Sequence, residues 1–370
     1  MFVGVGLGRF AYTPIIPFLI QDGIDPVAGN YAGAANLAGY FLGAVFAHRI
    51  GTLVGAGHAV RGAMVLTLVS FLACATPFGF VWLAFWRLLA GVTGAVQMIL
   101  GASMMLSRVA AGARGRAAGV IMTGVGLGVI LASAAIAPLA DRSVQFVWLA
   151  LAGLALIATV ASWHAWHEAP SIVSDPPPPG GARRFGPAVL LIVFAYACDG
   201  AGFVPHTIFW VDYVARDQGL GPAWGTISWL GFGAGAMVGP IAVGTLADRL
   251  GLGRSLVLAF LVKGLAVALA IVTAAPLALT LSAFLVGALS PGMTSLISAR
   301  LHELVHHRAH GKAWGLATLG FSAAQALGGL GMSSAFAALG NYTPIYGAGA
   351  LLEAAGLALA AWAWLSARGR

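Results

Sequence analysis

Apolar segments long enough to cross a membrane recur along the whole chain and are separated by short connections. A helix needs about 20 apolar residues to span the hydrocarbon core of a bilayer. Backbone polar groups in lipid must pair within the segment, and runs of this length favour helices over barrel strands of about 10 residues. We therefore expect an all-α integral membrane protein of about twelve transmembrane helices, near residues 2–21, 28–47, 60–79, 81–105, 117–138, 145–165, 187–210, 223–246, 255–274, 277–298, 313–338 and 344–366.

Composition supports the same fold class, because only 8% of residues are charged and 60% are apolar. A soluble domain carries about 25% charged residues, so a water-facing surface cannot be built from this chain. The first apolar segment contains Arg9 and lacks a basic leader and a small-residue cleavage site, which predicts a retained helix rather than a signal peptide. Cys74 and Cys198 both fall inside predicted spans, so no disulfide framework is expected.

The net charge of +8 could suggest a nucleic-acid partner, but the placement of the basic residues argues against one. With successive spans crossing in alternate directions, one side of the membrane holds only Arg142 and Arg216. The other side holds Arg49, Arg61, Arg108, Arg114, Arg116, Arg183, Arg184, Arg249, Arg254, Arg300, Arg308, Lys312, Arg368 and Arg370. This bias is typical of cytoplasmic loops and predicts cytoplasmic termini in a bacterial inner (plasma) membrane, with membrane lipids as partners of the basic face.

A proline-rich segment divides the chain into two sets of six spans. Its four consecutive prolines, 176–179, favour an extended and solvated conformation. We predict an N-terminal six-helix bundle at 1–167, a cytoplasmic linker at 168–186 and a C-terminal six-helix bundle at 187–370.

The two halves resemble each other at a constant offset, which predicts pseudo-symmetric bundles. Gly115-Arg116-Ala117-Ala118-Gly119 is matched by Gly311-Lys312-Ala313-Trp314-Gly315, and Gly91 and Gly124 are matched by Gly287 and Gly320. Chance is the alternative in a chain with 52 glycines. Duplicated six-helix halves are the layout of one large class of transporters, whose substrate site lies between the halves near the membrane midplane.

Two motifs resemble those of the major facilitator superfamily. Gly244-Thr245-Leu246-Ala247-Asp248-Arg249-Leu250-Gly251-Leu252-Gly253-Arg254 is similar to the G-x-L-A-D-R-x-G-R signature, with the last basic residue displaced. Arg87, followed by Gly91 and Gly94, resembles the R-x-x-x-G motif of the fourth helix. The first-half copy of the signature, Ala47-His48-Arg49, has His in place of Asp, and the fifth span lacks the internal Gly-Pro pair of antiporters.

The beginning of the chain carries a narrower resemblance. Gly6-Leu7-Gly8-Arg9-Phe10-Ala11-Tyr12-Thr13-Pro14, followed by Gly29-Asn30-Tyr31-Ala32-Gly33, is similar to the YbfB/YjiJ-type branch of that superfamily. The resemblance implies a monomeric secondary transporter that works by alternating access without a cofactor or a bound metal. It implies a gating role for Gly244, Asp248, Arg249 and Arg254, and a role of Arg87 in substrate or proton coupling.

Charged residues inside predicted spans are candidate functional residues, because each is costly to insert in a bilayer. Arg9 and Asp199 stand near the middle of the first and seventh spans, which line the central cavity in the resembled fold. A direct Arg9–Asp199 pair would make Asp199 a protonatable coupling residue, with a static ion pair as the alternative. Lys263 and Glu353 lie on helices that are usually peripheral, so we expect snorkelling or a structural pair there.

Further polar residues at plausible depth extend this candidate site. His206 follows Asp199 on the same helical face and could extend a proton path, or could lie at the outer interface. Tyr12, Asn36, Tyr40 and Gln97 are candidate substrate-binding residues, although Asn and Gln also link helices. Three basic against two acidic groups favour an anionic or zwitterionic small-molecule substrate. Trp86, Phe203, Trp210 and Trp229 could form part of its pocket, although an interfacial belt is the better explanation of Trp210.

One motif raises the possibility of an enzyme. His302-Glu303-Leu304-Val305-His306 matches H-E-x-x-H, which on one helix could bind zinc with Glu303 as the base of a membrane-embedded metalloprotease. No third ligand follows at the expected spacing, and we expect a cytoplasmic turn instead. A non-transporting receptor or scaffold is the other alternative, and no P-loop sequence supports ATP-driven transport.

Overall fold

The computed structural model of the chain describes residues 1–76, 78–110, 114–139, 142–166 and 185–368. Within these ranges all regular structure is helical, and eleven helical segments are long and apolar enough to cross a membrane. A further helix, α13 (His307–Leu339), has 33 residues and is rich in Gly, Ala and Ser. The predicted all-α membrane fold is confirmed, whereas the predicted linker at 168–186 lies, except for its last two residues, outside the described ranges.

The first half contains both long helices and short irregular ones. In chain order these are η1 (Phe2–Leu7), η2 (Phe10–Ile15), α1 (Ile16–Gln21), α2 (Pro26–Val54), α3 (Ala56–Cys74), α4 (Phe80–Val96), η3 (Gln97–Gly101), α5 (Ala102–Ser107), α6 (Arg114–Ile136), η5 (Ala137–Leu139), α7 (Val144–Ser162) and η6 (Trp163–Trp166). The start of α2 is fixed locally, because Asp25 accepts a hydrogen bond from the Val27 amide at 2.7 Å and Pro26 occupies the first helical position.

The second half follows a similar plan. Its elements are α8 (Pro187–Gly202), η7 (Pro205–Phe209), α9 (Trp210–Asp212), η8 (Tyr213–Asp217), α10 (Gly221–Leu250), α11 (Leu252–Val272), α12 (Pro276–Leu304), α13 and α14 (Thr343–Arg368). Single glycines with positive φ, Gly55 and Gly251, make the equivalent turns between α2 and α3 and between α10 and α11.

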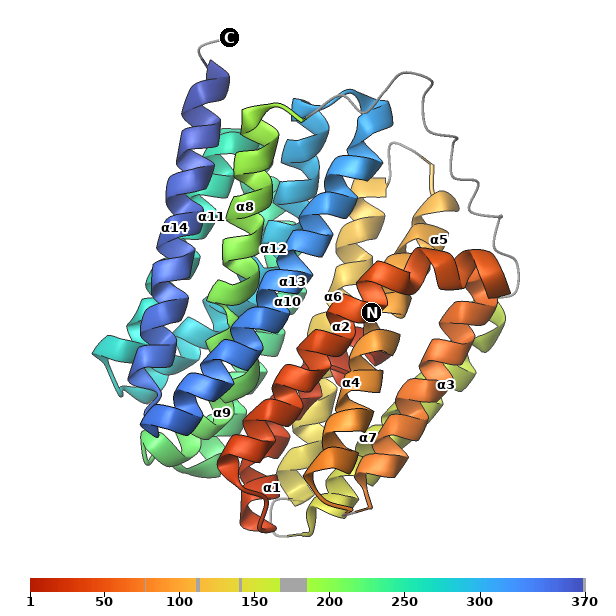
Figure 1. Ribbon diagram of the computed structural model, residues 1–370, viewed down its shortest axis with the longest axis vertical. Coiled ribbons are helices and arrows are strands. Elements are labelled where there is room, and N and C mark those ends of the chain that lie inside the picture. The colour runs from red at the N-terminus through yellow and green to blue at the C-terminus, as the bar shows by residue number, and fades with distance from the viewer. Residues whose placement is uncertain (77, 111–113, 140–141, 167–184, 369–370) are drawn as a thin grey trace.

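The helices of the two halves lie side by side in two groups (Figure 1). Across their boundary, α2 packs against α13 and α6 packs against α10. The Tyr31 hydroxyl of α2 lies 2.8 Å from the Ser334 hydroxyl of α13. At the end of the molecule opposite the C-terminus, η2 and α1 meet η7 and α9.

Equivalent glycines bring equivalent helices into close contact in both halves. A Cβ added at Gly39 on α2 would overlap the carbonyl oxygen of Leu88 on α4, and one at Gly235 on α10 would overlap that of Phe284 on α12. These four positions obey the sequence offset of the predicted repeat. The small residues let the helix backbones approach closely, as is usual in membrane helix pairs.

Several helices extend beyond the predicted apolar spans. Helix α2 has 29 residues and includes His48 and Arg49, and α10 runs to Leu250 and includes Asp248. At about 1.5 Å per residue such a helix covers the headgroup regions as well as the hydrocarbon core. The superfamily-like signature at 244–254 therefore lies mainly on helices rather than in a loop between spans. The turn itself is made at Gly251.

Candidate functional site

Three long helices change geometry at or beside predicted site residues. Arg9 stands between the π-helical η1 and the 3-10 helix η2, with φ −111° and ψ −62°. Gln97 begins the π-helical turn η3 after α4. Helix α8 ends at Gly202, and Phe203 lies between it and the π-helical turn η7. Such irregular turns free backbone groups and often mark functional sites in membrane helices.

Arg9 is a buried cation surrounded by aromatic rings. Its guanidinium carbon lies 4.9 Å from the ring centre of Phe10, 5.3 Å from that of Tyr40 and 5.8 Å from that of Phe203. The ring faces attract the positive charge. Within the described residues, the Nε and Nη2 atoms of Arg9 have no hydrogen-bond partner and no carboxylate pairs with it.

Arg87 forms a second buried cation, held between α4 and the first helix. Its side chain is 1% exposed, and its guanidinium carbon lies 4.4 Å from the ring centre of Tyr12. In the described part of the chain its Nε and Nη2 atoms also lack partners. The Tyr12 hydroxyl donates to the Gly29 carbonyl at 2.8 Å, which fixes the ring beside the guanidinium.

Asn36 and Gln97 connect helices around these arginines. The Asn36 side-chain amide donates to the carbonyl oxygens of Arg87, at 2.9 Å, and Gly8, at 3.3 Å. Gln97 donates to the Thr67 hydroxyl at 3.0 Å. Asn36 therefore positions the backbone on either side of the site, and the Oδ1 atom of Asn36 has no partner among the described residues.

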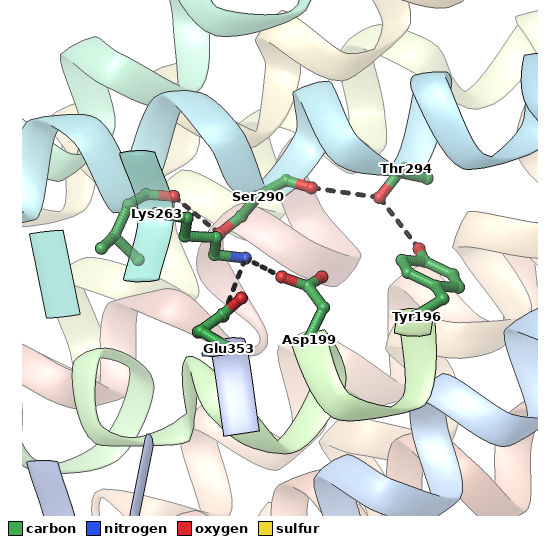
Figure 2. Close-up of polar contacts among 7 residues, drawn as sticks. Tyr196, Asp199, Lys263, Ser290, Thr294 and Glu353 are labelled. Carbon is green, nitrogen blue, oxygen red and sulfur yellow. Dashed lines mark hydrogen bonds and ion pairs between the residues drawn. The ribbon is translucent and has the colours of Figure 1, made fainter. Parts of the chain in front are cut away.

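A second cluster of charges joins α8, α11 and α14 (Figure 2). The Lys263 ammonium donates to Asp199 Oδ1 at 2.5 Å and lies 3.9 Å from Glu353 Oε1. All three side chains are buried, with at most 1% of their surface exposed. We call Asp199, Lys263 and Glu353 the acid–lysine triad.

This triad corrects one expectation from the sequence and decides between the two alternatives of another. Asp199 pairs with Lys263 rather than with Arg9, so the hypothesis of a direct Arg9–Asp199 pair is not met in this structure. Of the two alternatives expected for Lys263 and Glu353, snorkelling is excluded because both side chains are fully buried, whereas a structural pair is present at 3.9 Å. An aqueous surface is out of reach of their side chains, so they are compensated by one another and by Asp199.

Phe203 connects the triad to the arginine site. Its ring centre lies 4.2 Å from the Lys263 ammonium and 5.8 Å from the Arg9 guanidinium carbon. A change in the charge of the triad therefore changes the electrostatic potential at Arg9, because electrostatic interactions are strong in a low-dielectric region.

His206 and Trp210 are both buried in the protein. Nε2 of His206 lies 2.9 Å from the Ser282 hydroxyl, and the imidazole stacks on the Trp210 ring at 4.2 Å. Trp210 in turn donates to the Ser228 hydroxyl at 3.0 Å. Trp210 is thus enclosed by protein and does not face lipid as a residue of an interfacial belt would. The depth of His206 in the membrane stays a prediction.

One open cavity is lined by neither of the two arginines. A cavity of about 280 Å³ opens at the end of the second half, lined by residues that include Tyr213, Gln218, Thr273, Thr343 and Tyr346. The two arginines are instead enclosed by aromatic side chains. Within the described ranges no three His, Cys, Asp or Glu side chains are grouped so that they could hold a metal ion.

Comparison with known protein families identifies the chain. Residues 1–365 match the family described as "Uncharacterised MFS-type transporter YbfB". The chain belongs to this family. No curated protein matches it. The sequence-based assignment to the YbfB-type branch is thus confirmed, and the protein is a membrane transporter of the major facilitator superfamily.

The superfamily signature of this YbfB-type transporter is exposed in the present conformation. Gly244 has open space around its Cα, and the side chains of Asp248 and Arg249 make no hydrogen bond or ion pair to another described residue. The Arg254 guanidinium carbon lies 5.9 Å from the Trp364 ring centre. A gating role of these residues stays a prediction.

The H-E-x-x-H sequence is not carried on one helical face. Helix α12 ends at Leu304, and Val305 is extended with φ −125° and ψ 156°, which separates His302 from His306. Glu303 pairs with Arg300 at 2.7 Å. This geometry differs from the continuous helix that the zinc motif requires.

The sequence did not predict that Lys263 and Glu353 belong to the candidate site. Both were recognised as charges within spans, but the resemblance placed their helices at the periphery. The available signal was charge balance, because a buried Asp199 needs a compensating cation and Lys263 is the only lysine within any predicted span. The rotation of each helix about its axis decides which buried charges come into contact. Residue spacing along one helix does not determine this rotation.

Proposed function

We propose that this YbfB-type protein is a proton-coupled secondary transporter of a small organic anion or zwitterion. The substrate binds between the halves at Arg9 and Arg87, with Tyr12, Asn36 and Tyr40 around it. Asp199 belongs to the coupling site. The two bundles, 1–167 and 187–370, rock about this site and are joined by the linker 168–186. The protein works as a monomer in the bacterial inner membrane, with both termini in the cytoplasm.

The observation that carries the proposal is the pair of buried guanidinium groups with free donors. A buried charge is stable only when it is paired or hydrogen-bonded. Arg9 and Arg87 are compensated only by aromatic ring faces among the described residues, and each leaves two nitrogen atoms without a partner. A carboxylate or phosphonate group on a substrate would accept hydrogen bonds from the unpartnered nitrogen atoms of both arginines. Guanidinium groups bind such oxyanions with two parallel hydrogen bonds.

Aromatic groups favour an organic rather than an inorganic anion. Phe10, Tyr40 and Phe203 all contact the Arg9 guanidinium. Ligand sites are mostly apolar and carry a few polar groups that fix the orientation of the ligand. The rings would pack against the carbon skeleton of the substrate while the arginines hold its charged end.

Proton coupling is supported by the charge of the acid–lysine triad. Two carboxyl groups face one ammonium group in a region without solvent contact. Uptake or release of one proton there changes the net charge beside Phe203, and through it the electrostatic environment of Arg9.

The experiment is a thermal-shift screen of detergent-purified protein against organic acids, amino acids and neutral and cationic solutes at two pH values. A ligand that binds the folded state raises the melting temperature. We expect stabilising hits among anions or zwitterions, lost in Arg9→Ala and retained in Arg142→Ala, an exposed arginine of the described chain. A hit is then tested for uptake into proteoliposomes with an imposed pH gradient. Hits restricted to cations would overturn the substrate class, and uptake that ignores the pH gradient would overturn the coupling.

A further inference from the structure

We infer that Glu353 is the proton-binding residue of this transporter and that Lys263 is a cation shared between Glu353 and Asp199. The site lies inside the second half, between α8, α11 and α14, and not in the substrate site itself. Its role in coupling rests on the proposed function, but its ability to hold a proton does not.

The charges of the triad itself favour a bound proton. With all three groups ionised, the triad would carry a net negative charge in a place where none of its members has more than 1% of its side chain exposed. Arg9 is a further cation, but it makes no ion pair with the triad and only contacts the same Phe203 ring. Burial of an uncompensated charge is avoided by neutralisation, so one of the two carboxyl groups is protonated in this conformation.

The distances assign the proton to Glu353. Lys263 Nζ lies 2.5 Å from Asp199 Oδ1, a charge-assisted hydrogen bond, but 3.9 Å from Glu353 Oε1. Neither carboxyl oxygen of Glu353 has a hydrogen-bond partner among the described residues. An ionised Glu353 carboxylate would have no hydrogen bond and only the more distant ammonium to stabilise its charge, whereas Asp199 has the ammonium group in direct contact.

Close packing keeps the Glu353 side chain in place. A Cβ added at Gly202 on α8 would lie 2.9 Å from Glu353 Oε1, and one at Gly264 on α11 would lie 3.3 Å from Glu353 Cβ. Glycine at these two positions leaves room for the Glu353 carboxyl group next to Asp199 and Lys263. The two glycines are therefore part of the site, since larger residues would displace Glu353 from the ammonium.

The other titratable groups around the site do not replace Glu353. Cys198 on α8 and His206 on η7 lie close enough to interact electrostatically with the triad. His206 is already occupied at Nε2 by the Ser282 hydroxyl. Helix α13 carries no titratable side chain between residues 313 and 339. The charge of the site thus depends on Asp199, Lys263 and Glu353.

Release of the proton has a defined consequence for the helices. When Glu353 loses its proton to water, Lys263 faces two carboxylates and its bond to Asp199 is weakened by sharing. Asp199 and Phe203 belong to the same end of α8, so α8 is less firmly held to α11, and the added negative charge draws Arg9 toward the triad. An anion at Arg9 then competes with this charge, so proton binding and anion binding favour each other.

The test is infrared difference spectroscopy of the full-length protein in lipid vesicles between acidic and alkaline pH, with no substrate present. A protonated carboxyl group gives a C=O stretching band separate from amide absorption, and this band shifts in D₂O. We expect the wild type to show a band that persists at neutral pH, and we expect Glu353→Gln to lose it. Glu303→Gln, at a largely exposed carboxylate paired with Arg300, is the matched control and should retain it.

Asp199→Asn separates the two carboxyl groups. Removal of the Asp199 charge leaves Glu353 as the only anion near Lys263, so Glu353 should ionise and the band should disappear in this variant too. A band that survives in Glu353→Gln would overturn the assignment, and one that survives in Asp199→Asn would overturn the sharing of Lys263. A band with these properties in a protein that fails to bind any organic anion would support the proton site and contradict the proposed substrate.

Discussion

Arg9 and Lys263, which come from different halves of the protein, contact the same aromatic ring. The Lys263 ammonium lies 4.2 Å and the Arg9 guanidinium carbon 5.8 Å from the centre of Phe203. Phe203 occupies the point where α8 ends, close to Asp199. A single side chain, Phe203, thus separates the proposed substrate site at Arg9 from the proposed proton site at the triad. At this separation the charge of each site influences the binding of ligand or proton at the other.

The first prediction concerns the planar guanidinium of Arg87. We expect Arg87→Ala to weaken binding of an organic anion by about 10- to 100-fold, since a hydrogen bond to a charged group contributes about 1.5–3 kcal/mol. Arg87→Lys should recover only part of the loss, because an ammonium group keeps the charge but not the paired donors. Isothermal titration with a hit from the thermal-shift screen measures both. Equal affinities of Arg87→Ala and Arg142→Ala would remove Arg87 from the site.

The second prediction concerns the cation of the triad. Lys263→Met should lower the free energy of unfolding by about 3–5 kcal/mol, because it leaves a buried Asp199 without its partner. Addition of Asp199→Asn to this variant should restore part of the loss, since no charge then remains to be compensated. Reversible unfolding in mixed micelles measures the change, and Lys312→Met, at an exposed lysine, is the control. A loss in the double variant equal to the sum of both single losses would argue against the ion pair.

The sequence predicted the fold because bilayer crossing imposes a simple pattern of length and polarity. Helix ends were less predictable, and α2 and α10 continue past His48 and Asp248 because polar residues remain helical in the headgroup region. The irregular turns at Arg9 and Phe203 were not predicted. Glycine and proline near a helix break are equally common in continuous membrane helices, so composition alone does not locate such a break.

The sequence predicted which residues belong to the candidate site better than it predicted which of them are in contact. Arg9, Arg87 and Asp199 were selected because charges are costly in a bilayer, and all three are buried. Arg9 was considered as the partner of Asp199, and the partner in the structure is Lys263. Both pairings neutralise the same charge, so energetic reasoning from a sequence cannot choose between them. The choice is made by the rotation of α8 and α11 about their axes, which depends on packing throughout the bundle.

The third prediction uses the equivalent glycines of the two halves. Gly39→Ala and Gly235→Ala should each destabilise the protein by about 1–3 kcal/mol, because the new methyl group overlaps a carbonyl oxygen of the neighbouring helix. Gly62→Ala and Gly153→Ala have nothing within 4 Å of the new Cβ and should be neutral or slightly stabilising. Melting temperatures of the four variants in detergent provide the comparison. A melting temperature of Gly39→Ala or Gly235→Ala at or above that of the controls would contradict close packing at that helix pair.

The fourth prediction concerns contacts that hold the two halves together at the end opposite the C-terminus. The Thr13 hydroxyl donates to the carbonyl oxygen of Thr207, and the Trp229 indole donates to that of Phe10 at 3.2 Å. If alternating access opens this end, Thr13→Val should shift the equilibrium toward the open state. A hydrogen bond contributes about 0.5–1.5 kcal/mol, which corresponds to about a two- to twelvefold change in population.

Spin labels at Gln21→Cys and Asp217→Cys report this opening, since both positions are exposed and belong to opposite halves at this end. The native Cys74 and Cys198 are replaced by Ala in all samples. We expect pulsed electron-spin distance measurements to show a larger long-distance population in Thr13→Val. Thr123→Val is the matched control, because among the described residues that hydroxyl bonds to Val120 within its own helix and to no residue of the other half. Identical distance distributions in Thr13→Val and Thr123→Val would mean that the Thr13 bond does not control the closure of this end.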